Sequence, residues 1–249
     1  MNAATALDWD YGALAAHYRH RAPYAASALA RLFTLIALDA GATAADVGAG
    51  TGRLTAALVA ERFDVIAIEP NDAMRSIGAA FVPGARWLAT RGEATGLADA
   101  SCDLVAFGSS FNVLPAAVAL AEAARILRPG GWLACLWNHR DLGDPLQAAL
   151  QAAIEREVPG YTHGSRREDP RPAIAADGAF DSASALEGTI VHDVASADFV
   201  DGFRAHATLV RQAGDRMPRA LEALSRVLDG RERIAVPFVT RVFAARRRA

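Results

Sequence analysis

The chain has 249 residues, of which 52% are hydrophobic and 22% charged, and its formal net charge is −2. A chain of this length can bury a sizeable core, so we expect one large α/β domain rather than two independent units. The charge balance offers no strongly basic surface for nucleic acid or for an anionic membrane.

Lysine is absent from the sequence, so all 26 basic residues are arginines. Without lysine the chain cannot form a Schiff base or build a Walker-type phosphate loop, which excludes pyridoxal-phosphate enzymes, class I aldolases and P-loop NTPases. Cys102 and Cys135 lie far apart in apolar runs and are expected to be buried, inert thiols. No Asp, Glu or His cluster has the spacing of metal ligands, so we expect no metal.

No window approaches 18 uncharged apolar residues, and no basic N-terminal region precedes an apolar run. We therefore expect neither a transmembrane helix nor a signal peptide. A cytoplasmic monomer or homodimer is the corresponding expectation.

The first half of the chain alternates helix-like and strand-like patterns. The expected elements are two helices over 10–38 broken near Pro23, a strand at 44–47, a glycine turn at 48–52, a helix at 53–61, a strand at 64–68, a helix from its cap Asn71 to Ala80, strands at 86–89 and 103–107, a helix at 115–127, a turn at 129–131 and a strand at 132–137. Uninterrupted apolar strands alternating with helices predict a parallel sheet covered on both faces.

The second half is less regular. We expect a helix at 146–158, a long polar loop at 159–178, a strand at 186–192, helices at 197–212 and 216–228, and a final strand at 234–244. Loops as long as the one at 159–178 are usually functional or disordered, and this one is a candidate lid.

Three glycines with the spacing Gly-x-Gly-x-Gly, Gly48 to Gly52, follow Asp46 between a predicted strand and a predicted helix. Glycines let the backbone approach a ligand closely, and free N–H groups at a helix start can bind it. Glu69 ends the next strand, where a carboxylate can accept both hydroxyls of a ribose. A dinucleotide fingerprint needs a glycine where this chain has Arg53, which argues against an NAD-type dehydrogenase.

Residues 45–52 resemble motif I of the class I S-adenosylmethionine (SAM)-dependent methyltransferases. Further segments resemble that family's ribose loop, adenine edge, fourth strand and turn before the fifth strand, at 66–74, 92–97, 103–109 and 125–133. The resemblance covers about 44–137. It implies a Rossmann-like three-layer α/β/α sandwich with a seven-stranded, mostly parallel sheet and an antiparallel last strand. It also implies a single domain, 1–249, with an N-terminal helical lid at 1–40, a SAM-binding core at 41–140, and substrate-side helices with the last two strands at 141–249.

The resemblance further implies SAM as the cofactor. The residues expected to bind it are Asp46, Gly48, Ala49, Gly50, Gly52, Glu69, Pro70, Met74, Glu93, Ala94, Gly108 and Arg21. Arg21 belongs to a segment, 21–24, similar to an Arg-Pro-x-Tyr segment of many members, although the proline comes one place later here. Taken singly, Glu69 could be a solvated carboxylate, Met74 a core residue and Arg21 a solvated cation.

The acceptor of the methyl group is expected beyond the carboxyl ends of the strands. The expected substrate-binding residues are Tyr18, Tyr24, Ser110, Asn112, Trp137, Arg140 and Arg166. His139 is the first choice for a general base because imidazole titrates near neutral pH, ahead of His17, His163 and His206. A loop histidine bonded to backbone is the alternative. Arg140, Arg166 and Arg167 could bind a carboxylate or phosphate, or form a solvated turn.

The sequence therefore predicts methyl transfer from SAM to an O, N or C atom of a small molecule, leaving S-adenosylhomocysteine (SAH). It lacks the Asn/Asp-Pro-Pro-Tyr/Phe segment of amino-methylating enzymes and a Pro-Cys or Thr-Cys nucleophile, which argues against nucleic acid as the partner. The alternatives are a non-catalytic SAM-binding protein and, less favoured, an NAD-type dehydrogenase.

Overall fold

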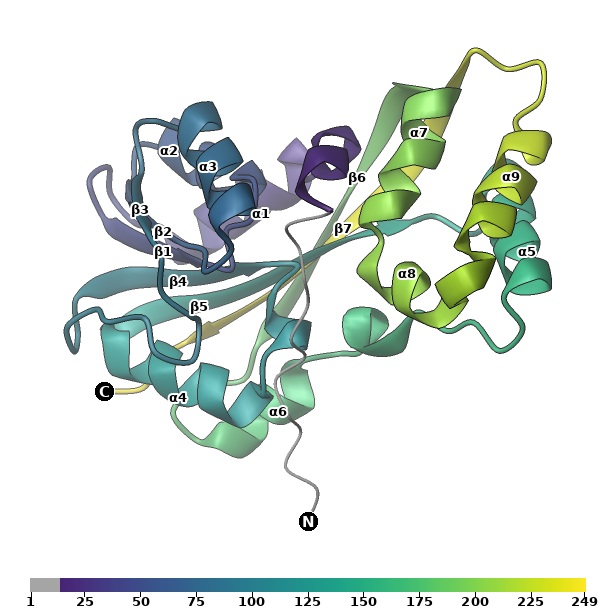
Figure 1. Ribbon diagram of the computed structural model, residues 1–249. Helices are drawn as coiled ribbons and strands as arrows, with labels where there is room; N and C mark the ends of the chain where they lie inside the picture. The colour runs from purple at the N-terminus through teal and green to yellow at the C-terminus, as the bar shows by residue number, and fades with distance from the viewer. Residues whose placement is uncertain (1–13) are drawn as a thin grey trace.

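A computed structural model describes residues 14–249, whose centre is one seven-stranded sheet in the order β3-β2-β1-β4-β5-β7-β6 (Figure 1). The strands are β1 Thr43–Val47, β2 Asp64–Ile68, β3 Arg86–Leu88, β4 Cys102–Gly108, β5 Leu127–Arg140, β6 Ser184–Ala195 and β7 Arg233–Arg246. β1 to β5 pair in parallel, and β7 is antiparallel to both β5 and β6. The predicted Rossmann-like sheet, with its antiparallel last strand, is confirmed.

Helices cover both faces of this sheet. The α-helices of the described residues are α1 Ala26–Ile36, α2 Arg53–Ala60, α3 Asp72–Phe81, α4 Ala116–Ile126, α5 Pro145–Glu157, α6 Arg171–Asp177, α7 Ser196–Gly202, α8 Ala207–Ala213 and α9 Met217–Val227. Short 3₁₀ helices are η1 Ala15–His20, η2 Phe111–Val113, η3 Gly164–Arg167, η4 Phe203–Ala205 and η5 Gly214–Arg216. Asn71 caps α3 as predicted, its Oδ1 accepting from the Met74 amide at 3.0 Å.

Side-chain alternation along the central strands sorts the core into two layers. Leu104 of β4 packs with Leu32 of α1 and Leu58 of α2 on one face. Its neighbour Val105 faces the other side, where Leu120 of α4 lies. Successive strand residues point to opposite faces, so an apolar run such as β4 serves both layers at once. The two layers form the sheet lobe.

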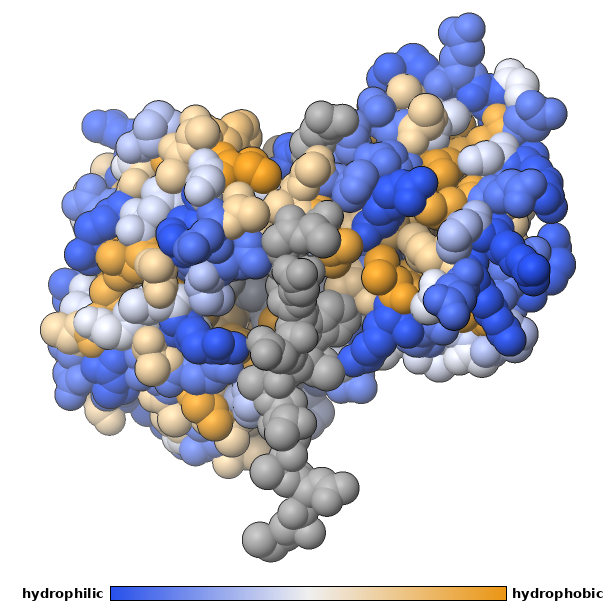
Figure 2. Space-filling model, viewed as in Figure 1, coloured by the Kyte–Doolittle hydropathy of each residue, from blue (hydrophilic) through white to orange (hydrophobic). Residues whose placement is uncertain are grey.

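A third apolar cluster forms a separate helical lobe from α5, α7, α8 and α9, beside the extended ends of β6 and β7 (Figure 1). Leu150 of α5, Leu209 of α8 and Leu224 of α9 are fully buried within it. Figure 2 shows mostly hydrophilic residues over the outer side of this lobe. The long antiparallel pair β6 and β7 thus connects the two lobes.

Several sequence predictions of local structure were wrong. The segment 159–178 is not one long loop, because it contains η3 and α6. The single helix expected at 197–212 is three short helices, α7, η4 and α8, and His206 caps the last by accepting from the Leu209 amide at 3.2 Å. The turn at 129–131 lies inside β5, where Gly130 has φ +80°.

The N-terminal helices also differ in part from expectation. Within 14–38 the first helix is the 3₁₀ helix η1 and the second is α1, on either side of Pro23. Residues 1–13 of the predicted lid lie outside the described residues. Within 14–249 no helix is long and apolar enough to cross a bilayer, and the thiols of Cys102 and Cys135 are buried and free.

Candidate functional site

A cavity of about 400 Å³ opens at the carboxyl ends of β1, β2 and β4. Its walls come from the glycine turn after β1, the start of α3, the segment after β4, η1, η3 and α8. This edge of a parallel sheet is where α/β proteins bind their ligands, and the volume lies in the usual range for a small-molecule site.

The glycine turn between β1 and α2 forms the floor of this cavity. Gly48, Gly50 and Gly52 all have positive φ, of +71°, +56° and +84°, which side chains other than glycine rarely adopt. A Cβ at Gly48 would lie 2.5 Å from Cβ of Ser110, so the close approach of the two segments also requires glycine there. The turn therefore presents bare backbone to whatever occupies the cavity.

Glu69, directly after β2, is hydrogen-bonded to this turn. Its Oε2 accepts from the Gly50 amide at 2.8 Å and its Oε1 accepts from the Asn71 amide at 2.9 Å. The side chain is buried, and burial raises the pKa of its carboxyl while the two amides and Arg75 lower it. Each carboxylate oxygen keeps a second lone pair, so Glu69 can still accept two hydroxyl groups from a ligand.

Asp46 lies in β1, fully buried and at the wall of the cavity. Its Oδ2 accepts from the Thr55 hydroxyl at 2.7 Å, whereas no described residue donates to its Oδ1. Burial raises the pKa of Asp46 to about 7. A buried acceptor without a donor is costly, so Oδ1 is suited to a donor group on a ligand.

The N-terminal segment forms the roof. Arg21 donates to the Ala205 carbonyl at 2.9 Å and lies over the Tyr18 ring at 4.6 Å. Tyr24 lies 3.3 Å from the Ser109 hydroxyl, and burial raises the pKa of Tyr24 to about 12. The Asn138 amide donates to the Pro23 carbonyl at 2.7 Å, which ties this segment to β5.

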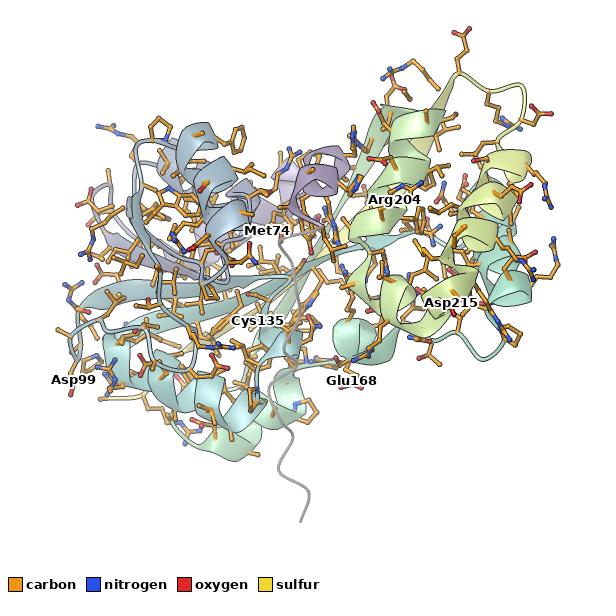
Figure 3. The ribbon with its side chains drawn as sticks, in the orientation of Figure 1. Met74, Asp99, Cys135, Glu168, Arg204 and Asp215 are labelled. Carbon is orange, nitrogen blue, oxygen red and sulfur yellow. The ribbon has the colours of Figure 1, made fainter. Side chains whose placement is uncertain are left out.

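Most residues expected at the site line this one cavity. Those from the predicted cofactor set are Arg21, Asp46, Gly48, Ala49, Gly50, Glu69, Pro70, Met74, Glu93 and Gly108, and those from the predicted substrate set are Tyr18, Tyr24, Ser110, Asn112 and Arg166. Met74 points from α3 toward the centre of the molecule, beside η1 (Figure 3). The Ser110 hydroxyl donates to the Val47 carbonyl, which fixes the turn against β4.

Five expected residues lie elsewhere. Gly52 faces Val82 and Trp87 in the packing behind the turn, and Ala94 is exposed to solvent. Trp137 is buried in the core and reaches the site only through its indole N–H, which donates to Asn112 Oδ1 at 2.9 Å. His139 and Arg140 line a second, adjoining cavity.

Sequence reasoning missed other lining residues. Ala207, Thr208 and Arg211 of α8 reach the cavity from more than 65 residues beyond the resembling segments, which end near 137, and Arg91 follows β3. Nothing in their local pattern marks them, because only the chain path through the helical lobe brings α8 over the sheet edge.

Comparison with known proteins shows that part of this chain is similar to a known family. Residues 45–135 match the family model described as a methyltransferase domain. The protein named "Uncharacterized methyltransferase Rv3342" from Mycobacterium tuberculosis is 41% identical over 96 residues, which cover 39% of this chain and 40% of that protein. The match thus spans less than half of that relative's length.

Solved structures repeat the fold over most of the chain. The YcgJ protein from Bacillus subtilis has a TM-score of 0.58 at 14% identity, covering 90% of this chain and 99% of that one. The phosphoethanolamine N-methyltransferase 2 from Haemonchus contortus, solved with SAH and phosphomonomethylethanolamine, has a TM-score of 0.52 at 12% identity, covering 90% of this chain and 52% of that one. At such identities the likeness is one of fold.

Sheet order, glycine turn and strand-end carboxylate together match the Rossmann-like methyltransferase fold of these structures. Residues 45–135 are similar to a methyltransferase domain.

Proposed function

We propose that the chain is an enzyme that transfers the methyl group of SAM to an O, N or C atom of a small molecule, leaving SAH. The observation that carries this proposal is the pairing of Glu69 with the glycine turn on the wall of one cavity. The family match over 45–135 supports it. SAM supplies an electrophilic methyl group: an electron pair of the acceptor atom forms the new bond to the methyl carbon as the C–S bond breaks to leave a neutral thioether.

The residues present fit this cofactor. Glu69 has lone pairs for two ribose hydroxyls, and the glycine turn lets backbone amides approach closely. Asp46 Oδ1, which lacks a donor among the described residues, suits an ammonium group such as that of the methionine moiety. Met74, only 2% exposed, offers an apolar contact for the adenine.

The chain's own contribution to methyl transfer would be alignment and exclusion of water. Arg21 and Tyr24 roof the cavity, and Arg166 and Asn112 line its other side. Holding donor and acceptor in line converts a bimolecular displacement into an effectively unimolecular step. His139 remains the proposed base, although burial and the nearby Arg167 and Arg166 lower its pKa to about 3. The lowered pKa keeps the His139 ring neutral near pH 7 and makes it a weak base.

Calorimetry with SAH tests the cofactor assignment. We expect SAH to bind and NAD not to bind, and we expect Glu69→Gln to weaken SAH binding at least tenfold, which is about 1.4 kcal/mol. The matched ligand is SAH lacking both ribose hydroxyls. If Glu69 accepts those hydroxyls, the variant loses far less affinity for that analogue, whereas an equal loss for both ligands would assign Glu69 only to holding the turn.

Methyl transfer itself needs a second measurement. We expect methyl-labelled SAM, incubated with the protein and an extract of small metabolites, to pass its label to a product of low molecular mass. Binding of SAH with no transfer to any fraction would instead identify a non-catalytic SAM-binding protein.

A further inference from the structure

A second cavity, of about 120 Å³, adjoins the first between the end of β5, η3, α7 and η4. The two cavities share Arg21, Ala22, Asn138 and Arg166 as lining residues. Its volume is that of roughly four water molecules, enough for a carboxylate or phosphate group but not for a nucleoside. A ligand could therefore place one end here and the other in the main cavity.

The wall of this second cavity is basic. Arg21, Arg140, Arg166 and Arg167 line it, and no Asp or Glu of the described residues does. Arg167 lies at its exposed side and donates to the Arg140 carbonyl at 3.2 Å, so these two arginines share one wall. Such a concentration of guanidinium groups attracts oxyanions, which they can bind through paired N–H donors.

Arg140 is the innermost of these cations by its contacts. Its guanidinium donates to Oε1 of Gln147 and to Oε1 of Gln151, both at 3.1 Å, and lies over the Phe203 ring at 5.2 Å. These glutamine amides are neutral, so they accept hydrogen bonds from the Arg140 guanidinium without cancelling its charge. Burial lowers the pKa of Arg140 to about 10, as expected for a cation removed from water without a carboxylate partner.

Among residues 14–249, the carboxylates nearest to Arg140 by the printed contacts lie outside the lining of the cavity. Glu155 accepts a hydrogen bond from the Gln151 side chain at 2.9 Å, so it reaches Arg140 only through Gln151. Asp198 and Asp201 lie 3.7 Å from His20, on the α7 side. In the described residues neither Arg140 nor Arg167 has a carboxylate oxygen within 4 Å.

Five histidines line this wall, namely His20, His139, His163, His192 and His206, and three of them are held neutral. Burial and the arginines lower the pKa of His139 to about 3, that of His163 to about 4, and that of His206 well below its usual value. No group of three His, Cys, Asp or Glu among the described residues is arranged to hold a metal ion. These neutral rings can donate one N–H each to an anion.

We propose that the second cavity binds an oxyanion of the methyl acceptor, so that the substrate is an acid carrying a carboxylate or a phosphate. This inference rests on the proposed function, because it assigns the acceptor end of the same site. Phe199, Phe203 and Phe238 line the same cavity, so the carbon next to the anionic group lies against an apolar surface and the rest of the substrate extends into the main cavity. Arg140 and Arg167 bind the anion, and Arg166 stands where the two cavities meet.

Calorimetry on the full chain loaded with SAH tests this proposal with three probes. Benzoate represents a carboxylate, phenyl phosphate a phosphate, and benzamide a neutral ring of the same shape. We expect at least one anion to bind and benzamide to bind at least tenfold more weakly. Whichever of the two anions binds more tightly identifies whether the cavity prefers a carboxylate or a phosphate.

Arginine variants locate the binding. We expect Arg140→Gln and Arg167→Gln each to lower the binding affinity for the anion at least tenfold, while the affinity for SAH stays within about twofold of the wild-type value. Arg167 is exposed, so its variant remains informative even if Arg140→Gln fails to fold. The matched control is Arg226→Gln on α9, which removes the same charge from an exposed ion pair with Glu222 and should change nothing.

The outcomes separate this proposal from the proposed function. Anion binding that the variants leave unchanged, equal binding of benzamide, or no anion binding to SAH-loaded protein would overturn the oxyanion site while the methyltransferase assignment stands. Anion binding that depends on Arg140 and Arg167 in a chain that does not bind SAH would keep the site and reject the function.

Discussion

At the residue scale, the site depends on two buried carboxylates with different roles. Glu69 has a backbone donor on each oxygen, whereas among the described residues Asp46 has a donor on only one of its two oxygens. The Glu69 carboxylate holds the turn in place and can also accept hydrogen bonds from hydroxyl groups of a ligand. The second is left short of donors in the folded chain, so it makes folding sensitive to pH.

Asp46 gives a specific pH dependence of stability. Its pKa is raised from 3.8 to about 7 by burial, so the folded protein binds this proton more tightly than the unfolded chain does. The resulting stability is fully present below about pH 4 and is lost as the pH rises through about 7. We expect Asp46→Asn to reduce the fall in free energy of unfolding between pH 4 and pH 8, measured by urea denaturation.

The control for this prediction is Asp64→Asn, which removes an exposed carboxylate at the start of β2. Its profile should follow the wild type. If Asp46→Asn and wild type lose the same stability over this range, the proton on Asp46 does not contribute to folding.

At the element scale, the glycine turn and its neighbours could be predicted because the relevant pattern is local. Asn71 before α3 and the apolar runs of β1, β2 and β4 each follow from a few adjacent residues. Helix α6 could not be predicted in the same way. It has seven residues, too few to show a helical period or to be stable alone, and it forms because Ile174 packs into the core beneath α4.

In the helical lobe, the predicted helices at 146–158 and 216–228 match α5 and α9, whereas the segment 197–212 escaped prediction for a similar reason. α7 ends at Gly202, and the chain turns again at His206, whose ring accepts from the Leu209 amide and stacks on Phe203. That break places α8 over the main cavity, where Ala207 and Arg211 line it. Long-range packing, which a local pattern does not contain, decides this part of the site.

Contacts between η1 and α7 give the element-scale prediction. His17 Nδ1 lies 2.6 Å from Asp201 Oδ2, and Arg21 reaches the Ala205 carbonyl nearby. Because this segment carries Tyr18 and Arg21 over the cavity, we expect Asp201→Ala to loosen it and to weaken SAH binding roughly tenfold, the typical effect of losing a charged hydrogen bond. Calorimetry and hydrogen exchange of 15–24 measure the two effects.

Asp193→Ala is the matched control, since Asp193 forms an exposed ion pair with Arg233 away from the cavity. It should leave SAH binding unchanged. Faster exchange in 15–24 with unaltered SAH affinity would show that the roof does not contact the cofactor.

At the scale of the whole molecule, the two lobes have separate cores joined by the long pair β6 and β7 (Figure 1). Glu69 and Gly50, which we propose bind the cofactor, lie in the sheet lobe. The acceptor residues proposed above lie mostly at the junction or in the helical lobe. This division suggests that the two halves of the site depend on different cores.

Matched cavity-forming substitutions test that division. Leu224 of α9 and Leu58 of α2 are both fully buried, one in each lobe. Removing a buried leucine side chain typically costs about 2–5 kcal/mol. We expect Leu224→Ala to lower hydrogen-exchange protection in α5 and α9. We also expect it to weaken the binding of benzoate or phenyl phosphate more than the binding of SAH. We expect Leu58→Ala to lower hydrogen-exchange protection around the glycine turn and to weaken the binding of SAH more than the binding of the anions. Equal loss of protection in both lobes from either variant would mean that they unfold as one cooperative unit.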